Sequence, residues 1–281
     1  MKIIWIVLLS LSLNATERII ALSPSINEIL FALGAGDQIV GNTTYCTYPK
    51  SSKKISKVGG YFEPNLEKIL ALKPTLVIMQ QHNLKLAKQL KQLNINTKIV
   101  KIDQIDNIKS SILEIGNELN KTQKAQSIVN DIDQHLKELK GIVTDKKILI
   151  VIGHNTSLVK QIFVAGQNLY FDDIIKASGN QNAFQSTRKG QPILNQENII
   201  ATNPDIVILL AHSMKEKGLT PHDLIKPWKD LPIKAAKKEH IYIIDKEYAG
   251  IPSDRLVLFL KEFKDILQNV KDKELQQSNP K

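Results

Sequence analysis

Cysteine is almost absent from this chain, which has 281 residues and a single thiol at Cys46. One thiol excludes an intramolecular disulfide. A lone cysteine is more often a small buried apolar residue than a reactive group, so we expect Cys46 to be buried. Because Cys46 also lies far from the N-terminus, we do not expect it to be the acylated cysteine that begins a bacterial lipoprotein.

Several enzyme motifs are missing as well. The sequence contains no HExxH, no GxSxG, no Walker phosphate loop and no CxxC. Such motifs position zinc ligands, a serine nucleophile, a nucleotide phosphate or a redox pair. Their absence predicts that the protein is not an enzyme of these classes.

Long apolar runs are scarce, and the chain begins with the clearest one. Met1 and Lys2 precede IIWIVLLSLSL, and the small residue Ala15 precedes the return of charge at Glu17. This run is too short for a membrane-spanning helix, which needs roughly 20 residues. A basic start and a small residue at the exit instead predict a signal peptide over residues 1–15. No second span follows, so we expect a soluble protein that is free in the periplasm and is not a lipoprotein.

Aromatic residues make up only 5% of the chain, whereas 42% is hydrophobic and the formal net charge is +10. A basic surplus attracts nucleic acid, an acidic membrane surface or an anionic ligand. The lysines are scattered through segments such as HNLKLAKQLKQL and are not gathered with aromatic residues, which argues against nucleic acid. We expect a lysine-rich solvated surface first and attraction of an anionic ligand second. The length predicts two domains, since a domain usually has roughly 100 to 200 residues.

One segment occurs twice. NLEKILALKPTLVIM begins at Asn65, and NQENIIATNPDIVILL begins at Asn195. In each copy a glutamate, Glu67 or Glu197, opens a short apolar helix that is followed by a proline and a strand of the buried type. A repeat at such a long interval predicts two similarly built lobes, with one acidic residue at the same place in each. Two lobes suggest a ligand between them.

Short apolar runs alternate with amphipathic ones over residues 16–119, which predicts a first lobe. RIIAL and TLVIM are typical strands, and in SINEILFALG the residues Ser25 and Glu28 have the spacing of a helix capping box. The same alternation over residues 142–281 predicts a second lobe. The expected fold class is α/β, with two lobes whose mainly parallel sheets are flanked by helices.

The segment between the lobes, residues 120–141, has a different pattern. From Lys121 to Leu139 apolar residues recur every three or four positions, with no Gly or Pro among them. This predicts one long rigid helix. At 1.5 Å per residue its length is roughly 30 Å, enough to cross one domain and reach the next.

Three histidines follow predicted strands. His82 comes after TLVIMQQ, His154 after ILIVIG and His212 after DIVILLA. In doubly wound folds ligands lie beyond the carboxyl ends of the strands, where imidazoles can coordinate a metal or hold an anionic chelate. No two of them form a close pair with metal-ligand spacing. A hydrogen-bonded loop histidine is therefore the alternative at each position.

Three stretches of the first lobe carry a family resemblance: RIIALSPSINEILFALGAGDQIVG, TYCTYP and KVGGYFEPNLEKILALKPTLVI. They resemble the helical-backbone (class III) periplasmic binding proteins of ABC importers for ferric siderophores, haem and vitamin B12. The resemblance covers nearly the whole mature chain. It implies two lobes bridged by one long helix, a shallow ligand cleft and a small closure. It also implies a monomer whose partners are an ABC permease dimer with its ATPase and a small metal chelate, and no nucleic acid.

The resemblance implies a role for the paired acids. Glu67 and Glu197 match two glutamates that, in this family, meet arginines on the two permease subunits. One carboxylate on each lobe suits a two-fold symmetric partner, because each can make a charge-assisted bidentate contact. The alternative is that both are ordinary first-turn residues, favoured there by the helix dipole.

Aromatic residues complete the candidate ligand site. Tyr45, Tyr61 and Phe163 match aromatic positions that contact the ligand in the vitamin B12-binding member of the family. Tyr45 and Tyr61 are expected in loops of the first lobe, and Phe163 and Tyr248 in loops of the second. Flat rings suit a large, partly apolar ligand such as a tetrapyrrole or a catecholate chelate.

Two departures from that member weaken the case for cobalamin. Gln80 and Gln191 stand where it has tryptophans, and KEYAGIPS has no arginine where it has one. We expect a ferric chelate first, haem and a corrinoid next, and a nickel, cobalt or zinc complex held by histidine fourth. Arg188 and scattered lysines can pair with an anionic chelate. The metal-containing ligand is expected as cargo, with no permanently bound cofactor, and a metal-dependent enzyme is the less expected alternative.

Overall fold

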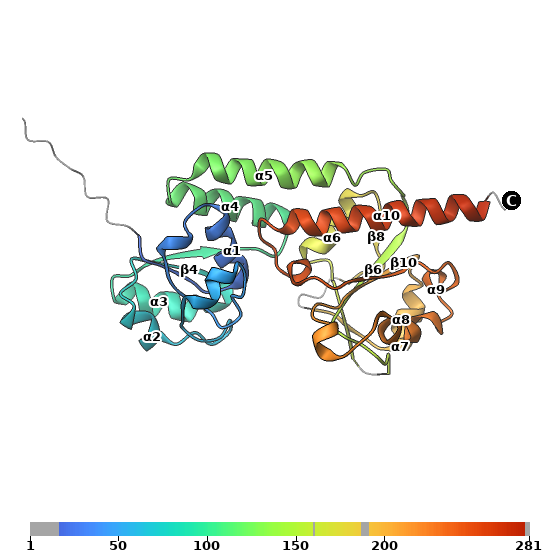
Figure 1. Cartoon of the computed structure of the whole chain (residues 1–281), viewed down its shortest axis with the longest axis horizontal. Helices are drawn as coiled ribbons and strands as arrows, with labels where there is room; N and C mark the ends of the chain where they lie inside the picture. The colour runs from blue at the N-terminus through green and yellow to red at the C-terminus, as the bar shows by residue number, and fades with distance from the viewer. Residues whose placement is uncertain (1–16, 160, 187–190, 279–281) are drawn as a thin grey trace, which may run out of the picture.

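The computed structural model describes residues 17–159, 161–186 and 191–278. It has two lobes, and the helices α5 (Thr122–Lys137) and α10 (Leu256–Ser278) run along the top of the molecule in Figure 1. The two-lobed α/β class predicted from the sequence is confirmed. The predicted signal peptide, residues 1–15, lies outside the described residues.

The first lobe is built on a five-stranded parallel sheet with the order β3-β2-β1-β4-β5. Its strands are β1 (Ile19–Ala21), β2 (Ile39–Asn42), β3 (Ser56–Lys57), β4 (Leu76–Gln80) and β5 (Asn96–Val100). Its helices are α1 (Pro24–Ala32), α2 (Leu66–Ala71), α3 (Leu84–Gln92) and α4 (Ile105–Glu118). The strands β1 and β4 read as continuous apolar runs because a central parallel strand is buried on both faces.

Alternate residues of β4 enter different cores, since successive side chains of a strand point to opposite faces. Ile78 packs in the core that contains residues of α1 and α4. Val77 and Met79 pack with residues of α2 and α3. The helices therefore cover both faces of the sheet, and the strand ends remain for a ligand.

The second lobe has a six-stranded sheet with the order β11-β10-β6-β7-β9, and β8 pairs with β6. Its strands are β6 (Lys147–Ile152), β7 (Ile162–Val164), β8 (Gln181–Asn182), β9 (Ile193–Leu194), β10 (Ile206–Leu210) and β11 (Ile241–Ile244). Its other helices are α6 (Tyr170–Ala177), α7 (Gln196–Thr202), α8 (Pro221–Lys229) and α9 (Lys234–Lys237). The sheet is mainly parallel, as predicted; β7 is the exception, because it runs antiparallel to β6 and β9.

The predicted connecting helix is α5, which ends two residues before the expected Leu139. Its residues Ala125, Val129 and Ile132 are buried in a core that runs from the first sheet to the second. The same core contains residues of α4, α6 and α10. Close packing resists deformation, so the lobes are joined by a layer of helices and not by one isolated rod.

One glycine permits the close packing of α4 on α5. A Cβ atom at Gly116 would lie 2.4 Å from the Cβ of Ala125, closer than real Cβ atoms approach. Glycine costs about 1 kcal/mol relative to alanine inside a helix. The close approach of the two helices explains why it stands there.

The predicted capping box of α1 is wrong. The helix begins at Pro24, and the N-cap is Ser23, whose Oγ accepts a backbone amide of the first turn at 3.2 Å. Proline suits the first helical position because it has no amide to leave unpaired, and the start therefore lies ahead of Ser25. Glu28 does not reach back to the cap; it is buried and pairs with an arginine of the second lobe.

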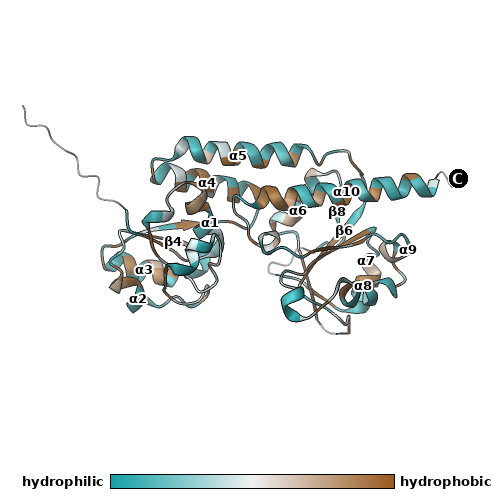
Figure 2. Cartoon of the chain, in the orientation of Figure 1, coloured by the Kyte–Doolittle hydropathy of each residue, from teal (hydrophilic) through white to brown (hydrophobic). Residues whose placement is uncertain are grey.

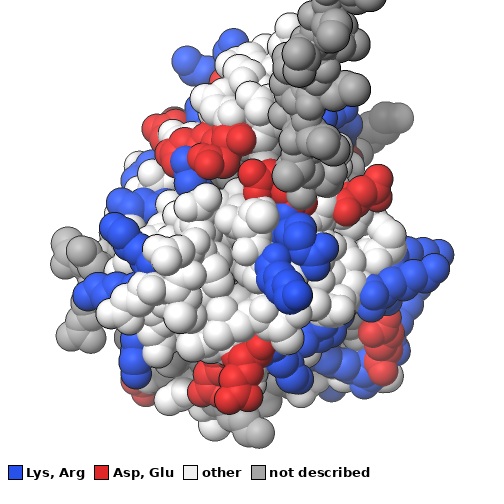
Figure 3. Space-filling view, turned by 90° about the vertical axis from the view of Figure 1, so that its left-hand side faces the viewer, with Lys and Arg blue, Asp and Glu red and all other residues white. Residues whose placement is uncertain are grey.

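Hydropathy and charge follow this construction. Polar residues line the outer faces of α5 and α10 in Figure 2, and the strands are mainly hydrophobic. Acidic and basic side chains are interspersed on the face shown in Figure 3, as expected for a solvated surface. In the described part of the chain no helix has both the length and the apolar character needed to cross a membrane.

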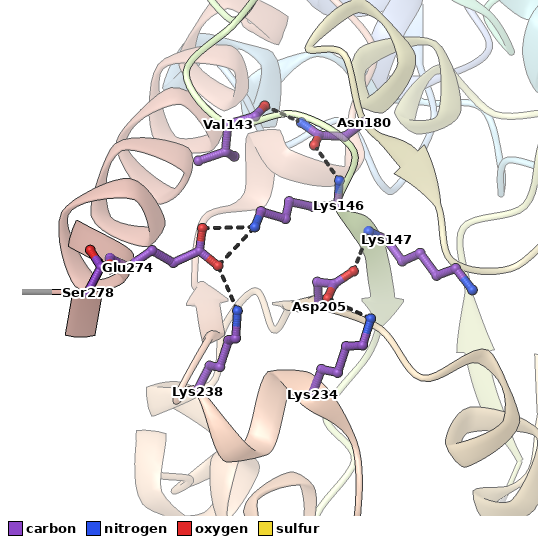
Figure 4. A network of polar contacts seen from close by, with 9 residues as sticks. All are labelled: Val143, Lys146, Lys147, Asn180, Asp205, Lys234, Lys238, Glu274 and Ser278. Atoms are coloured by element: carbon purple, nitrogen blue, oxygen red, sulfur yellow. Dashed lines mark hydrogen bonds and ion pairs between the residues drawn. The ribbon is translucent and has the colours of Figure 1, made fainter. Parts of the chain in front are cut away.

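A polar network fixes the far end of α10 to the second lobe (Figure 4). The carboxylate of Glu274 accepts from Lys146 Nζ at 2.8 and 2.9 Å and from Lys238 Nζ at 2.9 Å. Nearby, Asp205 accepts the backbone amide of Lys147 at 2.9 Å. Burial opposes the ionisation of Glu274, but the two lysines outweigh it and lower the pKa of that carboxyl. The last turns of α10 are thereby held against the sheet.

Candidate ligand-binding site

A cavity of about 890 Å³ lies between the lobes, at the carboxyl ends of strands from both sheets. The first lobe contributes Tyr45 after β2 and Gln80 at the end of β4. The second lobe contributes His154 after β6 and His212 after β10. Seven of the nine predicted ligand residues line it: Tyr45, Tyr61, Gln80, His82, His154, Gln191 and His212.

The first lobe presents an aromatic wall. The ring centroid of Tyr61 lies 4.6 Å from that of Phe62 and 4.5 Å from that of His82. Phe62 is 75% exposed, so its ring is available to a ligand. The hydroxyl of Tyr61 donates to Gln80 Oε1 at 2.9 Å. Burial raises the pKa of Tyr61 in spite of this hydrogen bond, so the free protein holds a protonated phenol at neutral pH.

Tyr45 stands at the mouth of the cavity with 62% of its surface exposed. Its loop is held by Lys57, whose Nζ donates to Asn42 Oδ1 at 2.7 Å and to the backbone oxygens of Cys46 and Ser52 at 3.2 and 3.1 Å. Cys46 is buried, as predicted. Burial raises the pKa of the Cys46 thiol, so it is an unreactive packing residue.

The second lobe presents imidazoles. His154 Nε2 lies within hydrogen-bond distance of the backbone oxygen of His212, and His154 Nδ1 lies 3.0 Å from Lys217 Nζ. A carbonyl only accepts and an ammonium only donates, so these partners assign a neutral His154 with its proton on Nε2. Both nitrogens of His154 are therefore occupied. His212 Nδ1 contacts Ser213 Oγ at 2.8 Å, and its Nε2 has no partner among the described residues.

The three predicted histidines do not form a metal centre. Across residues 17–159, 161–186 and 191–278, no group of three or more His, Cys, Asp or Glu side chains is placed to hold a metal ion. His82 belongs to the first-lobe wall, and His154 and His212 belong to the second.

Two predicted aromatic residues are not among the described residues of the cavity wall. Phe163, predicted in a loop, lies in the middle of β7 and is 41% exposed. A three-residue antiparallel strand is too short for its pattern to be recognised. The hydroxyl of Tyr248 donates to Glu262 of α10, and burial together with this carboxylate raises the pKa of Tyr248. Tyr248 thus faces the helical layer. The predicted Arg188 lies outside the described residues.

The two paired acids occupy equivalent places. Glu67 is exposed in the first turn of α2, where Asn65 Oδ1 accepts a backbone amide at 2.8 Å. Glu197 is exposed in the first turn of α7, where Asn195 Oδ1 does the same at 2.8 Å. In Figure 1 the helices α2 and α7 lie in different lobes, both on the side away from α5 and α10. Each carboxylate is free of ion pairs with the described residues.

Sequence analysis missed two residues that the structure brings to the cavity region. One is Phe62, which directly follows the predicted Tyr61 in the sequence and lines the cavity. Arg255 lies directly before α10 and is 7% exposed. Its position was a signal: a cation at a helix N-terminus opposes the helix dipole, so it indicates a specific acidic partner.

The chain belongs to the periplasmic binding protein family, whose profile matches residues 19–248. This confirms the resemblance seen in the sequence. Members of the family are binding proteins of transport systems that work outside the cytoplasm.

Individual relatives cover most of the chain. An uncharacterized ABC transporter substrate-binding lipoprotein of Bacillus subtilis is 29% identical over 255 residues, covering 88% of this chain and 78% of the relative. The high-affinity heme uptake system protein IsdE of Staphylococcus aureus is 28% identical over 233 residues, covering 77% of this chain and 75% of IsdE. The solved structure of the periplasmic vitamin B12 binding protein BtuF of Vibrio cholerae matches with a TM-score of 0.76 at 20% identity, over 91% of this chain and 98% of that chain. That structural likeness shows the fold.

Proposed function

We propose that this protein is an extracytoplasmic receptor that binds an iron chelate, a ferric siderophore or haem, or a related corrinoid, and delivers it to an ABC import permease with its ATPase. The heme uptake protein IsdE among its relatives supports an iron-chelate ligand. The observation that carries the proposal is the cavity of about 890 Å³ between two lobes. For delivery, we propose that the matched carboxylates of Glu67 and Glu197, on one side of the molecule, bind the permease.

The chemistry of the wall suits a flat, anionic chelate. Rings of Tyr61 and Phe62 provide aromatic surface on the first lobe, where a macrocycle or catecholate can stack. On the second lobe the amine of Lys246 provides a hydrogen-bond donor, and Nε2 of His212 can donate or accept according to the tautomer. Two carboxylates among the described residues line the cavity, and both have partners: Glu247 is paired with an arginine at 3.2 Å, and Asp103 Oδ1 accepts from Asn107 Nδ2 at 2.7 Å. Each therefore repels an anion less than a free carboxylate.

Tyr61 is the side chain that we propose for direct contact with iron. Tyrosine oxygen is a known ligand of ferric haem. In the free protein this hydroxyl donates to Gln80. Binding to iron requires loss of its proton, and a ferric ion supplies the positive charge that lowers the pKa of a coordinated phenol.

Visible absorption titrations of the purified mature protein test this proposal. The probes are hemin, cyanocobalamin, a ferric catecholate chelate and nickel with histidine. We expect saturable binding of one iron chelate or corrinoid and little affinity for nickel with histidine. Tyr61→Phe should lower the affinity for an iron chelate by at least about tenfold, equivalent to about 1.4 kcal/mol of binding free energy. It should also shift the absorption band of the bound chelate. Tyr242→Phe, which removes a hydroxyl bonded to Asn269, is the matched control and should change neither.

The proposal of import fails if no probe binds and the protein instead converts a substrate. A gene for a permease and one for an ATPase beside this gene are required by the import proposal and not by a metal-dependent enzyme. If nickel with histidine alone binds tightly, the ligand class is wrong while transport remains.

We further propose that the mature protein is a monomer free in the periplasm. The Bacillus subtilis relative is a lipoprotein. In this chain the single cysteine is Cys46, which is 1% exposed inside the first lobe and cannot present its thiol for acylation. Cell fractionation should recover the protein without detergent. Its mass should be that of a chain cleaved near Ala15. Recovery only with membranes would contradict a free protein.

A further inference from the structure

A buried ion pair joins the two lobes beside the cavity. Glu28 of α1 is 2% exposed, and Arg255 is 7% exposed. Arg255 Nε donates to Glu28 Oε2 at 3.0 Å, and Nη2 donates to Oε1. Ser253 Oγ, from the same segment as Arg255, donates to Glu28 Oε2 at 2.6 Å. The bonds span 225 to 227 positions of the chain and connect the first lobe to the second.

Arg255 touches the first lobe at a second point. Its guanidinium carbon lies 3.7 Å from the ring centroid of Tyr48, a cation–π contact. The backbone oxygen of Tyr48 accepts from Asn27 Nδ2 at 2.9 Å, which ties this loop to α1. The same loop carries Tyr45 of the cavity wall. Arg255 is therefore held by two separate elements of the first lobe.

A third contact links the pair to the cavity itself. Glu247 lines the cavity, and its Oε1 accepts from Arg255 Nη1 at 3.2 Å. Its Oε2 lies 3.5 Å from Oγ1 of Thr47, in the first lobe. Each carboxylate is thus bonded across the gap between lobes: Glu28 to the second lobe and Glu247 to the first.

The cost of burying charge indicates what this arrangement is for. Desolvating two ions offsets much of their attraction, so a buried ion pair adds little stability over apolar residues of similar size. Its strength is geometric, because a bidentate guanidinium–carboxylate contact fixes distance and angle together. An arginine that also stacks on a ring and reaches a second carboxylate has little freedom left.

We propose that Arg255 is a positioning residue that fixes the spacing of the lobes. Glu28 is its buried ion-pair partner, and Glu247 is its partner at the cavity wall. The spacing determines the width of the cavity. It also determines the separation of Glu67 and Glu197. This role goes beyond binding and delivery and does not depend on which ligand is carried.

The test measures the spacing of the lobes without ligand, so its failure is distinct from failure of the proposed function. Spin labels are attached to the full mature chain at Lys68→Cys in α2 and Asn198→Cys in α7, both exposed, with Cys46→Ser as background. Pulsed electron paramagnetic resonance gives the distribution of distances between the labels. With Arg255 and Glu28 present we expect one narrow distribution. In Glu28→Gln/Arg255→Gln, which leaves no unpaired buried charge between these two residues, we expect it to be roughly twofold broader or shifted.

Matched variants separate positioning from general weakening. Lys264→Gln removes a different ion pair of α10, the 2.9 Å contact to Glu138, and should leave the distribution unchanged. Tyr48→Leu and Glu247→Gln each remove one contact of Arg255 while keeping the buried pair, and each should broaden the distribution to a smaller extent. If the double variant Glu28→Gln/Arg255→Gln does not fold, these two single variants provide the test. An unchanged distance distribution in the double variant overturns the proposal, even where its melting temperature falls. If the double variant does not fold, unchanged distributions in both single variants overturn the proposal.

Discussion

At the scale of the residue, the positions of the strand ends in the sequence predicted much of the site. Only the tertiary contacts show which side-chain atoms are free to meet a ligand. His82, His154 and His212 were predicted at the cavity because that inference needs only the positions of the strand ends. The occupied nitrogens of His154 could not be predicted, since their partners lie 58 and 63 positions away. The same limit applies to Arg255, whose main partner lies 227 positions away.

A pH prediction belongs to this scale. Burial, with the nearby Glu28 as the next cause, raises the pKa of Asp254 to about 6. One Asp254 oxygen is buried without a hydrogen-bond partner in the described structure. A carboxyl whose folded pKa exceeds its unfolded value favours folding while it is protonated, and this contribution is lost as pH rises from about 4 through about 6. Asp254→Asn should therefore stabilise the protein at pH 7.5 by on the order of 2 kcal/mol.

Thermal unfolding between pH 4.5 and 7.5 measures this effect. The advantage of Asp254→Asn should shrink toward pH 4.5, where wild-type Asp254 is already protonated. Asp265→Asn, on the exposed side of α10, should follow the wild-type curve throughout. A constant difference between Asp254→Asn and wild type at every pH would show that ionisation of this carboxyl is not responsible.

At the scale of the element, periodicity identified the long helices and the central strands, because each buries a continuous apolar stripe or run. The strands β7, β8 and β9 have only two or three residues each, and their pairing depends on distant partners. No local pattern of that length identifies a strand. The predicted start of α1 is wrong for a local reason: Pro24 favours the first helical position, and this preference prevails over the capping-box spacing of Ser25 and Glu28.

The contact between α4 and α5 gives a prediction at this scale. Gly116→Ala places a Cβ 2.4 Å from that of Ala125, so the helices must separate. Overpacking costs typically about 1–3 kcal/mol, and the better helix propensity of alanine returns up to about 1 kcal/mol. We expect a net loss of about 1–2 kcal/mol in urea unfolding.

A second substitution should reverse the effect. In Gly116→Ala/Ala125→Gly the new methyl group meets the backbone oxygen of Lys121 at 3.4 Å and the Cα of residue 125 at 3.7 Å, which are ordinary contact distances. The double variant should be more stable than the sum of the two single variants predicts. Gly250→Ala, which meets nothing within 4 Å, is the control for alanine substitution. Strict additivity would mean that the two residues do not limit the approach of the helices.

At the scale of the whole molecule, the internal repeat predicted two lobes with one acid on each, and both are present. It predicted nothing about how the lobes are held. That depends on a core shared by α4, α5, α6 and α10 and on the pair of Glu28 and Arg255. Neither can be read from one lobe, because both form only when the lobes meet. These contacts hold the two lobes, and with them the two exposed acids, in the arrangement that the structure shows.

Delivery to a permease is the central claim, and the variant Glu67→Ala/Glu197→Ala tests it most directly. The measurement pairs the affinity of the purified variant for the chelate with uptake of that chelate by cells lacking the wild-type protein. We predict a Kd within about twofold of wild type and uptake reduced by at least about tenfold, since two charge-assisted contacts are lost. Glu114→Ala/Glu118→Ala, on α4, should keep both values, because those acids make only 3.6 Å contacts to Lys98. Loss of chelate affinity in the Glu67/Glu197 variant, or undiminished uptake, would contradict delivery through these two residues.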